Sequence, residues 1–333
     1  MPQIELVCPA GSLPALKTAV NNGADCVYLG FKDATNARNF SGLNFDDASM
    51  KEGIRYAHAR KARVLLALNT YPQSGNWAKW TGAVDKAAGL GIDAIILADP
   101  GLMGYALKTH PQLRLHLSVQ GSATSYEAIN FYHRHFGIQR AVLPRVLSLA
   151  QVEQVIASTP VEIEVFGFGG LCVMVEGAAR CRPTPPVNPQ LQRRLLPGKH
   201  VRWEQTPKGM ETRLNGILID RFDDGERAGY PTLCKGRFEV NGETYYAIEE
   251  PTSLNTLELL PTLLKAGVRA IKIEGRQRSP AYVAQVTAVW RAAIDRAIRD
   301  ADDFRVDGAW MAELNKVSEG QAHTLGAYYR PWK

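Results

Sequence analysis

The sequence lacks any run of apolar residues long enough to cross a membrane. No stretch approaches the roughly 18–20 residues that a membrane-spanning helix needs. The first residues, MPQIELVCPAG, also lack a basic segment followed by a long apolar core, so we expect no signal peptide and a cytoplasmic protein. Charged residues make up 22% of the chain and hydrophobic residues 45%, a balance that excludes a disordered or fibrous protein.

Cysteine is scarce, with five residues in 333, and without an export signal free thiols or metal ligands are expected rather than disulfides. Cys8 ends one predicted strand and Cys26 begins the next, where small thiols usually serve packing. Cys172, Cys181 and Cys234 instead lie in loops beside glycines. Zinc and iron–sulfur clusters both accept thiolates and usually take four ligands, so three cysteines indicate a metal site only weakly.

Several motifs of known chemistry are also missing. No H-E-x-x-H zinc motif and no G-x-S-x-G nucleophile motif occurs, and no glycine-rich phosphate loop follows the first strand. The formal net charge of +6 permits an acidic substrate, nucleic acid or an anionic membrane surface. An ordinary surface with an excess of lysine and arginine is the simpler interpretation.

The pattern that is present is an alternation of short apolar runs with amphipathic stretches. The runs are nearly continuous, which favours parallel strands buried on both faces. Helical stretches between them begin at serine and end at glycine, as at Ser12–Gly23, Ser125–Gly137 and Ser253–Gly267. Eight such units predict an α/β fold, a (β/α)8-type barrel, with a doubly wound open sheet as the alternative. The predicted strands are 4–8, 26–30, 64–68, 94–98, 115–119, 141–145, 162–166 and 270–274.

The alternation breaks after residue 170. We expect residues 1–170 and 251–300 to form the barrel and residues 171–250 to form an inserted β-rich region that carries three cysteines. This insert follows the seventh strand, and one of its hairpins should turn at Asn241–Gly242. Residues 301–333 are polar, show little periodicity and are expected to form a C-terminal tail.

In a barrel of this kind the active site lies at the carboxyl ends of the strands. The predicted catalytic residues are Arg145, Glu274 and Arg276, the last two within KIEGR. Arginines there can bind a carboxylate or phosphate through two parallel hydrogen bonds, so an anion-binding mouth is predicted. Each residue taken alone is also explained as a solvated loop side chain or a helix cap. Further polar candidates at the strand ends are Asn36, Arg38, Asn69, Asp99, Gln120 and Lys272.

Long motifs carry a resemblance to a known family. They are CPAGSLPALKTAVNNGADCVYLG, TNARNFSGLNF, EAINFYHRHFG, AGYPTLCKGR, EEPTSLNTLELLP and KIEGRQRSPAYVAQV. With these the chain resembles the collagenase-like peptidase superfamily over nearly its whole length except about residues 178–198. The resemblance implies a barrel-like fold and a 4Fe-4S cluster bound through four cysteines.

The family's ligand motifs match this chain only in part. The first ligand falls on Cys172 and the last on Cys234, and the second matches Cys181 with two alanines interposed. The third belongs to a G-A-C-S-P motif, where this chain has Leu195, Leu196 and Pro197. A local frameshift and a diverged loop both explain the difference, and either leaves cluster occupancy in this chain doubtful.

The resemblance also sets the functional expectations. Its best match is the branch of the superfamily that serves oxygen-independent hydroxylation in ubiquinone biosynthesis. There the chain would act on a ubiquinone precursor, as a heterodimer with a related UbiV-like partner. The alternatives are a peptidase, for which no nucleophile and base can be assembled, and an RNA hydroxylase. No basic strand rich in aromatic residues occurs, so we expect no nucleic-acid partner.

Overall fold

The structure is a computed structural model, and it describes residues 4–39, 42–171, 201–214, 217–223, 237–240, 242–246, 252–320 and 323–329. In this part of the chain, no helix is both long and apolar enough to cross a membrane.

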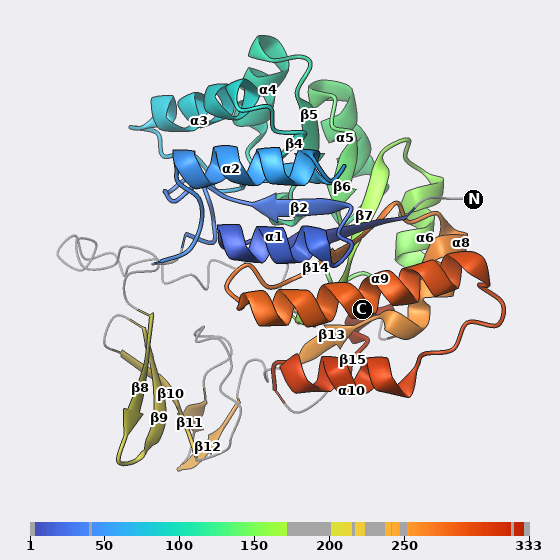
Figure 1. The fold of residues 1–333 in the computed structure, drawn as a ribbon. Helices are drawn as coiled ribbons and strands as arrows, with labels where there is room; N and C mark the ends of the chain where they lie inside the picture. The colour runs from blue at the N-terminus through green and yellow to red at the C-terminus, as the bar shows by residue number, and fades with distance from the viewer. Residues whose placement is uncertain are drawn as a thin grey trace.

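Eight parallel strands form a closed barrel at the centre of the molecule (Figure 1). Each strand pairs with the next, and β14 pairs with both β7 and β1, which closes the ring. The predicted barrel is therefore confirmed, and the open-sheet alternative is wrong. The strands are β1 (Glu5–Pro9), β2 (Cys26–Leu29), β3 (Arg63–Leu68), β4 (Ala94–Leu97), β5 (Arg114–Leu117), β6 (Arg140–Val142), β7 (Glu162–Gly170) and β14 (Ala270–Ile273).

Helices cover the outside of the barrel (Figure 1). Serine side chains accept backbone N–H groups at the start of α1, α5, α6 and α9, as the sequence predicts for the first two. The helices are α1 (Leu13–Asn21), α2 (Asp47–His58), α3 (Trp77–Gly89), α4 (Pro100–Thr109), α5 (Tyr126–Phe136), α6 (Leu149–Ala157), α8 (Leu260–Ala266), α9 (Pro280–Arg299) and α10 (Gly308–Val317). Short 3-10 turns are η1 (Val119–Gly121), η3 (Leu257–Leu259) and η4 (Gly326–Tyr328).

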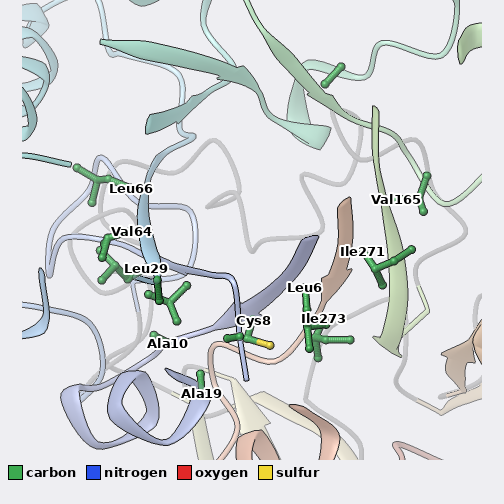
Figure 2. Close-up of a cluster of buried hydrophobic side chains, with 14 of the residues drawn as sticks. Leu6, Cys8, Ala10, Ala19, Leu29, Val64, Leu66, Val165, Ile271 and Ile273 are labelled. Carbon is green, nitrogen blue, oxygen red and sulfur yellow. The ribbon is translucent and has the colours of Figure 1, made fainter. Parts of the chain in front are cut away.

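The main core lies between the strands and this helical layer. Figure 2 shows part of it, where Leu6 and Cys8 of β1 meet Ile271 and Ile273 of β14 and Ala19 of α1. Because side chains alternate along a strand, the intervening residues of each strand face the barrel interior. Burial raises the pKa of the Cys8 thiol to about 12, so this cysteine is a packing residue, as expected.

Two small antiparallel sheets follow β7 in the sequence, and Figure 1 shows both outside the ring of barrel strands. This confirms the predicted β-rich insertion, and strands β11 and β12 pair on either side of the predicted turn at 241–242. One sheet consists of β8 (Val201–Thr206), β9 (Gly209–Leu214) and β10 (Ile217–Phe222), and the other of β11 (Phe238–Val240) and β12 (Glu243–Tyr245).

The helix predicted over 253–267 is wrong in its first part. Residues Ser253–Asn255 form strand β13, which pairs antiparallel with the end of β7, and the α-helix begins only at Leu260. The physical reason is that β7 extends beyond the barrel and offers an unpaired strand edge there. Strand β15 (His323–Thr324) adds to β13 in parallel. Helix α10, within the predicted tail, packs on α9, and its Leu314 is buried in the main core.

Candidate functional site

A pocket that is open to solvent lies at the carboxyl ends of the barrel strands. Arg145, Glu274 and Arg276 all line it, so the structure brings the three predicted catalytic residues together, while their catalytic role stays a prediction. Four cations and one carboxylate line the pocket, so its charge favours an anion. The lining residues are Tyr28, Arg38, Ala67, Asn69, Ile96, Ser118, Val119, Gln120, Val142, Arg145, Phe166, Lys272, Glu274 and Arg276.

Arg276 is held in place by the loop that follows β2. Its Nη1 donates to Asn36 Oδ1 at 2.9 Å, and its guanidinium lies 5.5 Å from the centre of the Tyr28 ring. The Tyr28 hydroxyl in turn donates to the Ile273 carbonyl at 2.8 Å. Burial raises the pKa of Tyr28 far above its ordinary value, so this ring stays neutral. Arg276 itself is only 5% exposed, so its orientation is fixed before any ligand arrives.

Arg145 reaches the pocket from the loop that follows β6. Its Nη1 donates to the Gly170 carbonyl at 2.6 Å, and its guanidinium lies 4.4 Å from the centre of the Phe166 ring. This distance is typical of a cation–π contact. Since both groups are contributed by β7, the strand that ends at the insert orients this arginine.

Lys272 joins the pocket to a column of charged side chains inside the barrel. Its Nζ lies 2.6 Å from Glu164 Oε1 and 4.0 Å from the centre of the Tyr28 ring. Glu164 also lies 3.5 Å from Arg140 Nη1, and Arg140 contacts Glu162 at 2.7 Å. These side chains are nearly all buried, so the contacts offset the cost of removing their charges from water.

The other end of the column reaches partly exposed side chains. Arg140 also pairs with Glu5, which pairs with Arg63, while Glu162 pairs with Arg114. Burial raises the pKa of Glu5 but the two arginines beside it lower it more, so the net shift is downward. The pKa of Glu162 is lowered in the same way by Arg140 and Arg114, against its burial.

His116 lies inside the barrel beside this column. Burial and the nearby Arg140 and Arg114 hold the pKa of His116 well below its ordinary value, so the ring is neutral. Arg114 Nε lies 3.2 Å from His116 Nε2, which makes Nε2 the acceptor and places the proton on Nδ1. Sequence reasoning did not select this residue.

Some of the remaining predicted polar residues line the pocket, and the others hold neighbouring groups in place. Asn69 and Gln120 line the pocket, and Asn69 Oδ1 accepts the Ala37 N–H at 3.0 Å. Asn36 is buried and holds Arg276. Asp99 caps helix α4 by accepting the Leu102 N–H at 2.8 Å, which is the structural role that a single polar residue at a strand end often has.

The structure adds residues that the sequence reasoning missed, chiefly Tyr28, Arg140 and Glu164. A signal for Glu164 was present, because strands that read as apolar carry charged or polar residues two positions apart. Such pairs are Glu162 with Glu164, Arg114 with His116, and Lys272 with Glu274. A spacing of two places both members on one face of a strand.

The three predicted metal ligands, Cys172, Cys181 and Cys234, lie outside the described residues. So do Leu195 and its neighbours, where the family's third ligand would fall. Cys8 and Cys26 are buried in β1 and β2. Among the residues that the structure describes, no group of three His, Cys, Asp or Glu side chains is arranged to hold a metal ion.

Comparison with known proteins settles the family. The family model described as Peptidase family U32 matches residues 11–182 and 226–331. The chain belongs to peptidase family U32. This U32 chain is 27% identical to tRNA hydroxylation protein P1 of Bacillus subtilis over 96% of its length and 70% of that protein. It is 29% identical to tRNA hydroxylation protein P of Escherichia coli, over 96% of this chain and 72% of that protein.

Other U32 relatives bear protease names. An uncharacterized protease of Methanocaldococcus jannaschii is 30% identical over 99% of this chain and 74% of its own length. The solved U32 peptidase Mk0906 superposes with a TM-score of 0.45 at 13% identity, over 54% of this chain and 76% of that chain.

Proposed function

We propose that this U32 chain takes part in a hydroxylation reaction whose substrate binds in the pocket at the barrel mouth. The observation that carries the proposal is family membership together with relatives named for tRNA hydroxylation. The pocket supports it, because Arg145, Lys272 and Arg276 are oriented there by fixed partners before a substrate binds.

The substrate that the relatives favour is tRNA. Every pocket cation could contact a phosphate or a polar base edge, and arginine suits both. We therefore propose an RNA substrate first, although the sequence alone led us to expect no nucleic-acid partner. In this proposal, the chain holds one nucleotide of the RNA at the barrel mouth, and the positive pocket binds the charged or polar groups of that nucleotide.

A ubiquinone precursor is the second candidate. The motifs AGYPTLCKGR and KIEGRQRSPAYVAQV resemble UbiU, the ubiquinone-biosynthesis protein of this superfamily, which works with UbiV. The pocket supports an aromatic substrate too, because Ala67, Ile96, Val142 and Phe166 form an apolar part of its lining. An aromatic ring could pack there while an attached carboxylate meets the arginines.

A peptidase reaction has less support. Among the described lining residues the only hydroxyl nucleophile of the serine type is Ser118, whose Oγ accepts the Gln120 N–H at 3.2 Å. The described lining contains no histidine to act as its base.

The resemblance also leads us to propose Cys172, Cys181 and Cys234 as ligands of a 4Fe-4S cluster, held at low occupancy because leucine stands at residue 195, where the family has its third cysteine. When bound, such a cluster would supply electron transfer. The contribution of the described residues is separate from it: the arginines and Lys272 bind and orient an anionic substrate, and the neutral Tyr28 and Phe166 rings keep water from the cation faces that they cover.

The test is a gene deletion in the source organism, grown with and without oxygen. Hydroxylated tRNA nucleosides and ubiquinone are both measured by mass spectrometry, and the wild-type gene is returned on a plasmid. Loss of a hydroxylated nucleoside supports the tRNA substrate, and loss of ubiquinone only in anaerobic cells supports the quinone precursor. If both products are unchanged, the proposed hydroxylation role is wrong.

A further inference from the structure

The barrel interior contains an arrangement that substrate binding alone does not explain. Barrels of this type are usually filled with branched apolar side chains. Here Lys272, Glu164 and Arg140 form a buried row, with Glu164 placed between two cations at 2.6 Å and 3.5 Å. Glu164 is fully buried, and Lys272 and Arg140 are almost so.

We infer that Lys272 contacts the anionic group of the substrate and that Glu164 is a positioning residue that keeps Lys272 charged and directed at the pocket. Lys272 Nζ has three N–H donors, of which Glu164 Oε1 accepts one. The ammonium also lies over the Tyr28 ring, and both residues line the pocket. The inference deepens the proposed function, on which it rests for the identity of the pocket as the reaction site.

The role of Glu164 follows from its position. If its charge were removed, Lys272 and Arg140 would be two buried cations without the carboxylate between them. A neighbouring like charge and burial both disfavour the charged form of a lysine. Arg140 keeps its proton in any case, so Lys272 would be the group that loses one. The charged or titratable groups around Lys272 are Glu164 of β7, Tyr28 of β2, Arg140 of β6, His116 of β5, Glu274 and Arg276 at the end of β14, and Arg38.

The experiment measures binding of sulfate, an anion that does not titrate between pH 6 and 9, by equilibrium dialysis of the full chain. With the Glu164 carboxylate beside Lys272, wild-type affinity should be nearly constant across this range. Glu164→Gln should bind within about threefold of wild type at pH 6 and about tenfold more weakly at pH 9, the loss expected if only about one lysine in ten still carries its proton there. Lys272→Met should bind at least tenfold more weakly at every pH.

Two further variants separate positioning from simple damage. Glu162→Gln makes the same change at the partly exposed end of the column, and it should leave sulfate binding unchanged. The double variant Glu164→Gln, Lys272→Arg restores a group that cannot lose its proton, so its affinity should again be independent of pH. Circular dichroism checks folding, and if Glu164→Gln does not fold, Lys272→Met alone decides whether the lysine contacts the anion.

Several results would overturn the inference. The first is a wild-type chain that shows no saturable sulfate binding. The second is a Lys272→Met variant that binds sulfate as tightly as wild type. The third is a Glu164→Gln variant whose sulfate affinity does not change with pH. Each would leave the proposed hydroxylation role standing, because the readout is anion binding rather than product formation. Conversely, a deletion strain with unchanged levels of hydroxylated tRNA nucleosides and of ubiquinone would contradict that role, while the result of the sulfate experiment would still stand.

Discussion

Side chains that follow the barrel strands differ in their exposure and in their hydrogen-bond partners. Arg276 lines the pocket, yet it is buried and its guanidinium donates a hydrogen bond to Asn36. A strand-end position alone does not distinguish a solvated arginine from one that the preceding loops already hold. Asp99 also follows a barrel strand, but its carboxylate accepts the Leu102 N–H and so caps helix α4.

We expect Arg276→Ala to lower the proposed hydroxylation activity at least tenfold, since the pocket loses a cation whose orientation is fixed in advance. The free energy of unfolding should fall by about 1–3 kcal/mol, because a buried hydrogen bond to a charged group is lost. Product formation and urea unfolding check the two effects. Arg278→Ala is the matched control: Arg278 donates to the Val317 carbonyl and does not line the pocket, so activity should persist. If Arg276→Ala and Arg278→Ala lost activity to the same extent, Arg276 would act only in folding.

The carboxylates of the barrel column predict how stability depends on pH. The folded pKa of Glu162 lies below the ordinary 4.5 because Arg140 and Arg114 outweigh the effect of burial. A lowered folded pKa stabilises the protein above the unfolded pKa, and this contribution disappears as pH falls through the folded pKa. Glu162→Gln should therefore lower the melting temperature at pH 7, and the difference from wild type should shrink below pH 4.5.

The control for this prediction is Glu52→Gln. Glu52 pairs with Lys17 on the surface, and such exposed pairs contribute at most about 1 kcal/mol. Its melting curve should follow wild type at every pH. A wild-type to Glu162→Gln difference that stays constant down to pH 2 would contradict the role assigned to the carboxylate.

At the scale of elements, the loops that follow β1 and β14 approach each other closely enough to fix the pocket wall. A Cβ added at Gly11 would lie 1.7 Å from the Arg276 carbonyl oxygen. The backbone that carries Arg276 can therefore take its place only because residue 11 has no side chain. This contact joins the N-terminal strand to the last barrel strand at the site.

Gly11→Ala should thus displace the Arg276 loop, lower stability by about 1–3 kcal/mol as overpacking does, and weaken sulfate binding. Gly89→Ala is the control, since a Cβ there meets nothing within 4 Å and the residue lies in helix α3. That change should raise stability by about 0.4–1 kcal/mol. Urea unfolding and dialysis give both readouts, and a Gly11→Ala protein with wild-type binding would show that the loop adapts.

At the scale of the whole molecule, the sequence predicted the barrel because its strands are short, apolar and regularly spaced between capped helices. It did not reveal β13, since the run from Ser253 has helical spacing and only the edge of β7, distant in sequence, makes its first residues a strand. Nor did it reveal the charged column. Contacts such as Lys272 with Glu164 join residues 108 positions apart, and only closure of the ring brings them together.

The cluster prediction also concerns the whole chain. With three family-matched cysteines and leucine at residue 195, we expect the anaerobically purified protein to contain well under four irons and four sulfides per chain. Iron and acid-labile sulfide analysis measures this. Leu195→Cys should raise both, while Leu196→Cys is the neighbouring control. Full occupancy in the unchanged chain would show that the fourth ligand comes from elsewhere.

The buried ionic row has a consequence for how the strands find their partners. Arg140 lies beside Glu162 in the pairing of β6 with β7. A slip of one residue would turn Arg140 toward the apolar helical layer and remove one of the two cations beside the buried Glu164. A purely apolar interior would tolerate such a slip far better, because it distinguishes strand registers only by shape. The charged interior therefore makes misregistered closure costly, and it limits the chain to one arrangement of its strands.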